Sequence, residues 1–327
     1  MMKTMKKGKT IFGALLLLLG LFGMFAFSSD ACAAEFPSKP ITLIVPHSPG
    51  GGSDICARLL AQYLQEEFSW TVVVVNNPTG AGEGAFLEVL NARKDGYTVG
   101  YMNAGQICNT LMRKTKYKLE DYEFVAMQTS DPRVLLVRKG DERFGTLDEF
   151  IKYAKEHPGE LTVADSTPGG TEHFCTEAAA FYGGYEVAPL HMTSGAESKA
   201  ALLGKHVDAI SMTLAEAAPM VKEGQGTILA VSAAKRHPMF PDVPTFVEKG
   251  IEVEMDVLRG IYVAKGVPAE VIKTLSDAVE KVTENPKYVA ALDALVLAPN
   301  YRAHEDFTKY VFEFRDDFKA KLEKIGW

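Results

Sequence analysis

The chain has little cysteine, no metal-ligand spacing and no second long apolar run after its N-terminal leader. Four cysteines occur among 327 residues. If Cys32 leaves with the leader, Cys56, Cys108 and Cys175 allow at most one internal disulfide, whose pairing stays open. None of the seven histidines has cysteine or carboxylate companions at zinc-site intervals. We therefore expect no metal site and no cofactor.

Net positive charge is also absent. The leader holds four of the 35 basic residues and one of the 42 acidic ones, so the rest of the chain holds 31 against 41, a net charge of about −10. This acidity argues against nucleic acid or an anionic membrane as a partner. An anion must then be captured by local geometry, because the overall field repels it.

Residues 1–33 have the pattern of a secretory signal peptide. Four lysines precede an apolar run over residues 11–27, and Ala31-Cys32-Ala33-Ala34 supplies a small-residue cleavage site. An uncleaved anchor helix and a lipoprotein at Cys32 are the alternatives, but the run is shorter than the ~20 residues that usually span a bilayer, and Ser29-Asp30-Ala31 lacks the aliphatic residue of a lipoprotein site. We expect a periplasmic protein.

The remaining sequence alternates strand-like and helix-like runs, which is typical of βαβ units with a parallel sheet. A first set ends in two strands within residues 124–138, separated by Ser130-Asp131-Pro132. A second set follows, and the tail carries helices that return to cover the first. Strands are expected over 41–45, 71–75, 98–102, 161–164, 186–190, 208–212 and 227–233, and helices over 55–67, 86–92, 147–156, 172–182, 197–203, 214–223, 268–284, 288–295 and 304–324.

The two sets predict two α/β lobes joined by a hinge. Extended crossings near Leu135 and Leu258 would leave a cleft between the lobes. We expect lobe 1 to hold residues 34–136 and 259–327, and lobe 2 to hold residues 137–258.

Two glycine-rich turns stand between a strand-like run and a helix-like run. The first is Pro49-Gly50-Gly51-Gly52-Ser53-Asp54, in which Ser53 or Asp54 can cap the helix. The second is Ser166-Thr167-Pro168-Gly169-Gly170-Thr171. A helix start after such a turn presents unpaired N–H groups that attract anions. Two of them in one chain indicate a receptor for a small carboxylate, although each alone is also consistent with a structural turn.

Other segments give weaker signals. The first turn lacks the Lys-Ser/Thr of a P-loop, and Gly80-Ala81-Gly82-Glu83-Gly84 has the wrong spacing for a dinucleotide fingerprint. Asn103 follows a strand and could recognise a carboxylate or carbonyl. His173 could donate to an anion or cover the helix end. Arg259, in the second crossing, could pair bidentately with a carboxylate or form a surface salt bridge.

Seven motifs follow one another in order through nearly the whole chain after the leader. They are Pro37-Ser38-Lys39-Pro40-Ile41, the first glycine turn, Asn77-Pro78-Thr79-Gly80-Ala81-Gly82, Asp95-Gly96-Tyr97-Thr98, Thr167-Pro168-Gly169-Gly170-Thr171-Glu172-His173, Leu202-Leu203-Gly204-Lys205-His206-Val207-Asp208 and Pro241-Asp242-Val243-Pro244-Thr245. In this order and spacing, the chain resembles the periplasmic solute receptors of tripartite tricarboxylate transporters, often called the Bug family.

The resemblance implies a type 2 periplasmic binding protein fold, in which two α/β lobes close on one ligand. It implies an organic acid or amino acid as ligand, the large and small membrane subunits of a permease as partners, and no enzyme activity. We expect a monomer with no catalytic residue. The residues expected to bind the ligand are Pro49, Gly50, Gly51, Gly52, Ser53, Asp54, Asn103, Ser166, Thr167, Gly170, Thr171, His173, Ser194, Glu197 and Arg259.

The chain departs from the family pattern at several of these places. His191-Met192-Thr193-Ser194 stands where Pro-Tyr-Lys-Gly is common, Glu197 replaces a proline, Leu258-Arg259 replaces an aromatic pair, and His47 replaces an aromatic residue. Loss of the lysine and gain of Glu197 would suit a ligand with an ammonium group, whereas gain of Arg259 would suit a second carboxylate. The ligand therefore stays open.

Two other functions are alternatives. An exported hydrolase or isomerase could use His173 with Asp54 or Glu172 as an acid–base pair. A sensor subunit could present the ligand-bound lobes to a membrane kinase.

Overall fold

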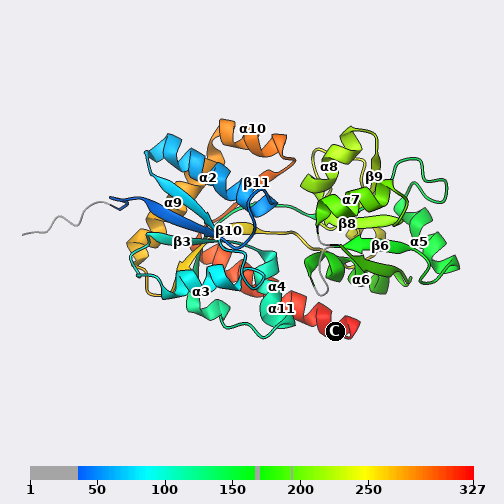
Figure 1. Ribbon diagram of the computed structural model, residues 1–327, viewed down its shortest axis with the longest axis horizontal. Helices are drawn as coiled ribbons and strands as arrows, with labels where there is room; N and C mark the ends of the chain where they lie inside the picture. The colour runs from blue at the N-terminus through cyan, green and yellow to red at the C-terminus, as the bar shows by residue number, and fades with distance from the viewer. Residues whose placement is uncertain (1–35, 166–169, 193) are drawn as a thin grey trace, which may run out of the picture. The chain divides into compact units, whose positions relative to one another are not determined.

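The computed structural model describes residues 36–165, 170–192 and 194–327, and its strands form two sheets (Figure 1). The first sheet has the order β11-β4-β10-β3-β1-β2 and combines strands from both ends of the chain. The second has the order β7-β6-β8-β5-β9 and comes from the middle. The strands are β1 (Ile41–Val45), β2 (Val72–Asn76), β3 (Thr98–Asn103), β4 (Tyr122–Ser130), β10 (Arg259–Ala264) and β11 (Ala298–Arg302) in the first sheet, and β5 (Arg133–Arg138), β6 (Thr162–Asp165), β7 (Ala188–His191), β8 (Ala209–Thr213) and β9 (Gly226–Val231) in the second.

Both sheets are mixed, so the prediction of parallel sheets is right only in part. β1 pairs parallel with β2 and β3, as βαβ units require. β10 runs antiparallel to both β3 and β4, and β5 runs antiparallel to β8 and β9. These two strands follow the crossings instead of a crossover helix, which explains why a βαβ pattern does not predict their direction.

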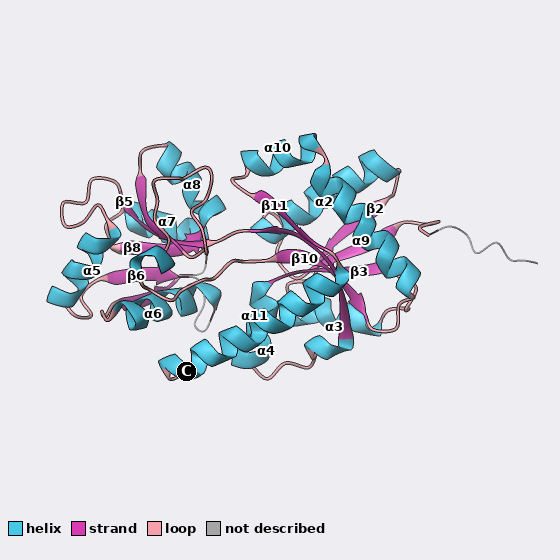
Figure 2. Cartoon of the chain, turned by 180° about the vertical axis from the view of Figure 1, so that it is seen from behind, coloured by secondary structure: helices cyan, strands magenta, loops and turns pink. Residues whose placement is uncertain are grey.

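Helices cover both faces of the first sheet (Figure 2). The side chains of Phe86 and Tyr262 stack in its core with ring centroids 4.3 Å apart. Gly100 makes room for this pair, since a Cβ there would lie 2.1 Å from the Tyr262 ring. One face carries α2 (Gly52–Phe68), α9 (Ala269–Glu284) and α10 (Pro286–Ala294), and the other carries α3 (Glu83–Asn91), α4 (Ala104–Met112) and α11 (His304–Ile325), while the short η1 spans Leu119–Asp121.

The second sheet is also covered on both faces. Along β5, Leu135 and Val137 enter one hydrophobic cluster, whereas Val134 and Leu136 enter another, as the period of two in a strand requires. The first cluster takes side chains of α5 (Leu147–Glu156) and α6 (Thr171–Gly183), and the second takes side chains of α7 (Gly195–Leu203) and α8 (Leu214–Lys222). The short η2 spans Val247–Lys249.

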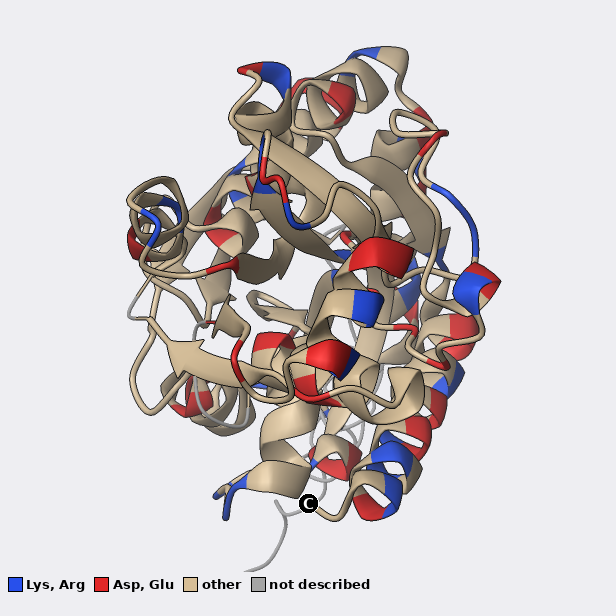
Figure 3. Ribbon diagram, turned by 90° about the vertical axis from the view of Figure 1, so that its right-hand side faces the viewer, with Lys and Arg blue, Asp and Glu red and all other residues tan. Residues whose placement is uncertain are grey.

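The tail of the chain differs from its prediction in two ways. β11 adds an unexpected edge strand to the first sheet. Helix α11 packs Phe307 and Val311 into the core of the first sheet but Phe318 and Leu322 into the core of the second. The tail therefore covers the first sheet, as expected, and also contacts the second. Acidic and basic residues are interspersed along α11 (Figure 3).

The chain passes between the sheets twice. The first crossing is Ser130-Asp131-Pro132, because Leu135 already pairs with Ser211 and Ala230 in the second sheet. The predicted boundary between residues 136 and 137 therefore falls inside β5. The second crossing precedes Arg259, and the N–H of Val257 donates to the carbonyl of Asp131 at 3.0 Å, which joins the two crossings.

Of the helices in the described part of the chain, none has the length and apolarity needed to cross a membrane.

Candidate functional site

The first glycine turn leads from β1 directly into α2, as predicted. Pro49, Gly50, Gly51 and Gly52 are exposed, and Gly50 has a φ of +81°, which favours glycine. The N-cap residue is Gly51, without a side-chain cap, so the prediction that Ser53 or Asp54 caps the helix is wrong. The first-turn N–H groups of α2 have no intrahelical partners, which makes this end attractive to an anion.

Asp54 shapes this turn from beneath. Its buried carboxylate accepts hydrogen bonds from the N–H of Gly50 at 2.8 Å, from Arg58 at 3.0 Å and from the amide of Asn76 at 2.8 Å. Asn76 also donates to the carbonyl of His47 at 2.9 Å. Burial opposes ionisation of Asp54, but these hydrogen bonds outweigh it and lower the pKa. We infer that Asp54 holds the turn in place rather than contacting the ligand.

Asn103 joins the turn to a helix that the sequence patterns did not predict. Its side chain caps α4 by accepting from the N–H of Gly105 at 2.8 Å, and Gln106 completes the capping box. The amide of Asn103 donates to the Oγ of buried Ser53 at 3.1 Å. Asn103-x-x-Gln106 is a recognised helix-start signal, so this helix could have been found from sequence.

Arg259 begins β10 beside Asn103 in the first sheet. Its guanidinium is buried and donates to Asp131 at 3.1 Å. A Cβ on Gly52 would lie 3.1 Å from the Nη2 atom of Arg259, so the guanidinium fills the space that a side chain would take. The alternative of a surface salt bridge for Arg259 is therefore wrong.

Asp131, which sequence reasoning did not select, connects this arginine to the second sheet. One carboxylate oxygen accepts from Arg259, and the other accepts from the N–H of Ala215 in the first turn of α8 at 3.2 Å. Its residue is 1% exposed. Asp131 therefore contacts the first sheet through Arg259 of β10 and the second sheet's helix α8 through Ala215.

Asp256, just before the second crossing, gives a prediction for pH. Burial raises its pKa to about 6, with Asp131 and Glu254 acting in the same direction and the Ser130 hydrogen bond and Arg259 opposing them. The folded protein then holds this proton more tightly than the unfolded chain, so stability should fall as pH rises from about 4 through about 6, by roughly 3 kcal/mol in all. Urea unfolding should show this decline, and Asp256→Asn should remove it while the exposed control Glu254→Gln keeps it. The same slope in Asp256→Asn would refute the assignment.

The second glycine turn leads from β6 into α6. Ser166 and Thr167 lie outside the described residues. Gly170 is the N-cap of α6, and Thr171 is buried in its first turn. Thr171 and Glu172 bind a buried arginine that sequence reasoning missed, since Arg133 donates to the Oγ1 of Thr171 at 2.6 Å and pairs with Glu172 at 2.5 Å.

His173 lies in the first turn of α6, among aromatic rings. Its ring centroid lies 4.6 Å from that of His191 and 4.6 Å from that of Trp327, which follows the end of α11. Asp54 belongs to the first turn and Glu172 pairs with Arg133. The carboxylate that the structure places beside His173 Nε2 is that of Glu177, at 3.8 Å, and it was not part of the acid–base alternative.

Ser194 and Glu197 lie at the start of α7. The Oγ of Ser194 accepts from the N–H of Glu197 at 3.2 Å and caps the helix, and both residues are exposed. The structure therefore gives Ser194 a capping role, and a ligand role for either residue stays a prediction.

His47 links the two turns electrostatically. Burial, and to a smaller extent the charge of Arg259, lower its pKa to about 4, while Glu172 acts in the opposite direction. Arg259 lies under the first turn and Glu172 follows the second, so His47 lies within electrostatic reach of both. The structure thus brings Gly52, Ser53, Asn103 and Arg259 together in one group and Thr171 and Glu172 in another.

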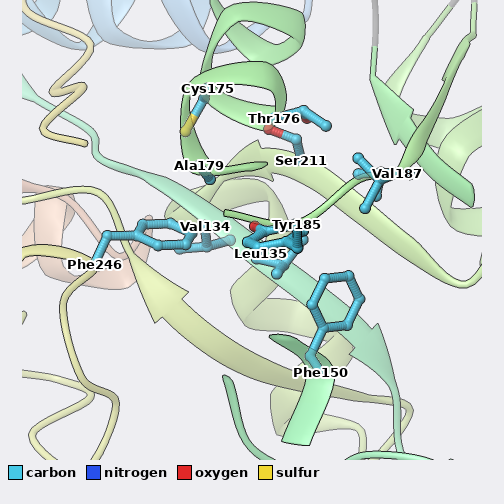
Figure 4. Close-up of a pocket in the computed structure, with 11 residues that line it drawn as sticks. Val134, Leu135, Phe150, Cys175, Thr176, Ala179, Tyr185, Val187, Ser211 and Phe246 are labelled. Atoms are coloured by element: carbon cyan, nitrogen blue, oxygen red, sulfur yellow. The ribbon is translucent and has the colours of Figure 1, made fainter. Parts of the chain in front are cut away.

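Two hollows lie elsewhere. One is a cavity of about 10 Å³ inside the second sheet's core, among Phe150, Tyr185 and Phe246 (Figure 4), which is at most large enough for one water. The other, of about 470 Å³, lies between the end of α4 and α11, and basic residues including Arg113, Lys114 and Lys118 line it.

Among the described residues, no cluster of His, Cys, Asp or Glu side chains could hold a metal ion, and Cys56, Cys108 and Cys175 are buried free thiols.

Comparisons with known proteins agree on one family. The family model described as "Tripartite tricarboxylate transporter family receptor" matches residues 56–327. A "UPF0065 protein in gbd 5'region" of Cupriavidus necator is 29% identical over 93% of both chains. A solved TctC solute binding protein from Polaromonas is 29% identical with a TM-score of 0.77, covering 88% of this chain and 99% of its own. The structure titled "R. palustris Rpa4515 with adipate" is 25% identical with a TM-score of 0.79, covering 89% and 99%.

Proposed function

Because the chain belongs to the tripartite tricarboxylate transporter receptor family, we propose that it captures a small carboxylate between its two lobes and delivers it to the membrane subunits of a tripartite permease. The family and the periplasmic binding protein fold predicted from sequence are confirmed. The two lobes of the proposal are the two sheets with their helices, divided at the crossings. Export by cleavage of residues 1–33 and action as a monomer are parts of the proposal.

The observation that carries the proposal is the pair of glycine-led helix starts. The amino end of α2 has Arg259 packed against Gly52, and the amino end of α6 has Arg133 bound to Thr171. Each glycine-led helix start places a positively polarised helix end beside a buried arginine. Positive charge is therefore concentrated at these two places although the net charge of the chain is negative. His47 responds to charges from both groups, which supports one shared ligand.

The relatives support the choice of ligand class. The solved Rpa4515 structure is that of the protein with adipate, a dicarboxylate. The two positively polarised helix ends of this chain also favour a negatively charged ligand, so we propose a carboxylate. A ligand that also carries an ammonium group would need a carboxylate such as that of Glu197 to pair with it. The proposal does not assign Glu197 a contact with the ligand.

Thermal unfolding with acetate, succinate, malate, adipate and glutamate tests this function. A ligand that binds only the folded state stabilises it by roughly 2.7 kcal/mol at 100 times its Kd, so we expect a saturable rise in Tm with at least one acid. Succinamide and equal ionic strength of sodium chloride are the controls. No rise with any acid, or an equal rise with succinamide, would count against the proposal.

A further inference from the structure

Arg259 carries hydrogen-bond donors that the described residues do not satisfy. Its residue is 4% exposed. Nη2 donates to Asp131 and lies against Gly52, but Nε and Nη1 are buried and have no acceptor among the described residues. An unmade hydrogen bond at a buried charged group is costly, so two such donors beside a helix start point to an anion.

His47 has a third buried nitrogen without a partner among the described residues, and it lies within electrostatic reach of Arg259. The Oδ1 of Asn103 is occupied by the N–H of Gly105, so the Nδ2 atom of Asn103 is the one that faces His47 Nε2, at 3.5 Å. An amide nitrogen can only donate. Nε2 is therefore the bare nitrogen and the proton sits on Nδ1, which is buried without a partner in the described part of the chain.

We propose that His47 and Arg259 form a donor-only anion subsite at the amino end of α2, which binds an ionised carboxylate through Nδ1–H of His47 and the Nε–H and Nη1–H of Arg259. This inference rests on the proposed function and specifies its first-lobe contacts. A carboxylate offers only acceptors and suits this set, whereas a primary amide brings an NH₂ donor that has no acceptor there.

The subsite needs a fixed turn and a fixed arginine. The carboxylate of Asp54 accepts from the N–H of Gly50 at 2.8 Å, which keeps the turn in place beside the guanidinium of Arg259. Asp131 holds Arg259 at 3.1 Å and is itself held by the N–H of Ala215. Asp131 is a positioning residue, and because Ala215 belongs to α8, it ties the subsite to the second lobe.

The role of His47 as a neutral donor has its own signature. Asn103 contacts the ring, Arg259 of the first lobe and Glu172 of the second act on it electrostatically, and its pKa lies at about 4. Affinity for a carboxylate should therefore stay constant between pH 6 and 8. A histidine that binds as a cation would instead lose affinity over this range.

Nitrogen NMR of the ligand-free protein tests the subsite directly, with acetate as the probe. Titration should move the Arg259 Nε and His47 Nδ1 signals saturably, while sodium chloride at equal ionic strength does not. His47 should show Nδ1 protonated and Nε2 bare at pH 7. Unmoved signals at both residues, or the opposite tautomer, would overturn the inference.

Affinity measurements on variants give a second test, with the panel acid that raises Tm most. His47→Phe, which keeps the ring size, and Arg259→Lys, which keeps the charge, should each raise Kd about tenfold. Asp131→Asn should also raise Kd. The controls His157→Phe, at a partly exposed position in lobe 2, and Arg93→Lys, at an exposed position, should not. If the acid binds but neither His47→Phe nor Arg259→Lys changes Kd, the subsite fails and the proposed function stands. If acetate moves the signals but succinate, malate, adipate and glutamate all fail to raise Tm, the proposed function fails alone.

Discussion

Asp54→Ala lowers the free energy of unfolding by about 2–3 kcal/mol and abolishes detectable carboxylate binding. The wild-type carboxylate is buried and accepts from Gly50, Arg58 and Asn76. Hydrogen bonds to a charged group contribute about 1.5–3 kcal/mol, and their loss leaves donors unpaired. Without them Gly50 loses its anchor, and the N–H groups at the start of α2 lose their arrangement. Urea unfolding and calorimetric titration measure the two effects.

The control for this variant is Asp277→Ala. Asp277 pairs with Lys273 at the same four-residue spacing as Asp54 with Arg58, but it is exposed. Its removal should leave stability and binding unchanged, since exposed pairs contribute little. Because the pKa of Asp54 is lowered in the folded state, its contribution is present above the unfolded pKa of about 4 and is lost as pH falls through the folded value. Equal stability of Asp54→Ala and wild type at neutral pH would refute the structural role.

Arg133→Met is expected to have an effect of similar size in the second lobe, about 3 kcal/mol. The side chain of Arg133 is 7% exposed and pairs with Glu172, which is 17% exposed, while it also donates to Thr171. Removing one partner of a buried pair leaves the other charge uncompensated. Carboxylate binding should weaken as well, because both partners begin α6 at the second glycine turn. Urea unfolding and titration again provide the measurements.

A double variant separates the lost pair from a general packing defect. Arg133→Met combined with Glu172→Gln should recover most of the lost stability, because no charge is then left unpaired. Arg138→Met is the matched control, since Arg138 ends the same strand, its side chain is 20% exposed, and its partner Asp141 keeps Arg143 as a second partner. Simple additivity in the double variant, or an equal loss in Arg138→Met, would contradict the account.

Local sequence signals predict much of this fold. The pattern of residues 147–156 predicts α5 at the bounds it has, because Thr146 and Glu149 supply a capping box. The breaks at Pro132 and at the glycine turns also coincide with the ends of elements. Alternation of strands and helices places the parallel strands, whose order follows from βαβ units. These features depend on residues close together in the chain.

Features that depend on distant residues are absent from the sequence prediction. Arg133 and Glu172 are 39 positions apart, and Asp131 and Arg259 are 128 apart. The residues around each member of these pairs carry no signal that identifies its distant partner. The direction of β10 and the second contact of α11 are likewise set by the crossings and by the cores of both sheets. The glycine turns and Arg259 were selected from sequence, but Arg133 and the pairing of Arg259 with Asp131 were not.

The central claim is that one carboxylate contacts the amino ends of both α2 and α6. A crystal structure of the protein with the panel acid that raises Tm most tests it most directly. The account predicts the acid's oxygens within hydrogen-bond distance of the Gly51–Gly52 backbone and of the Gly170–Thr171 backbone in the same molecule. An acid bound to only one of these helix ends, or bound elsewhere with both ends filled by side chains, would contradict it.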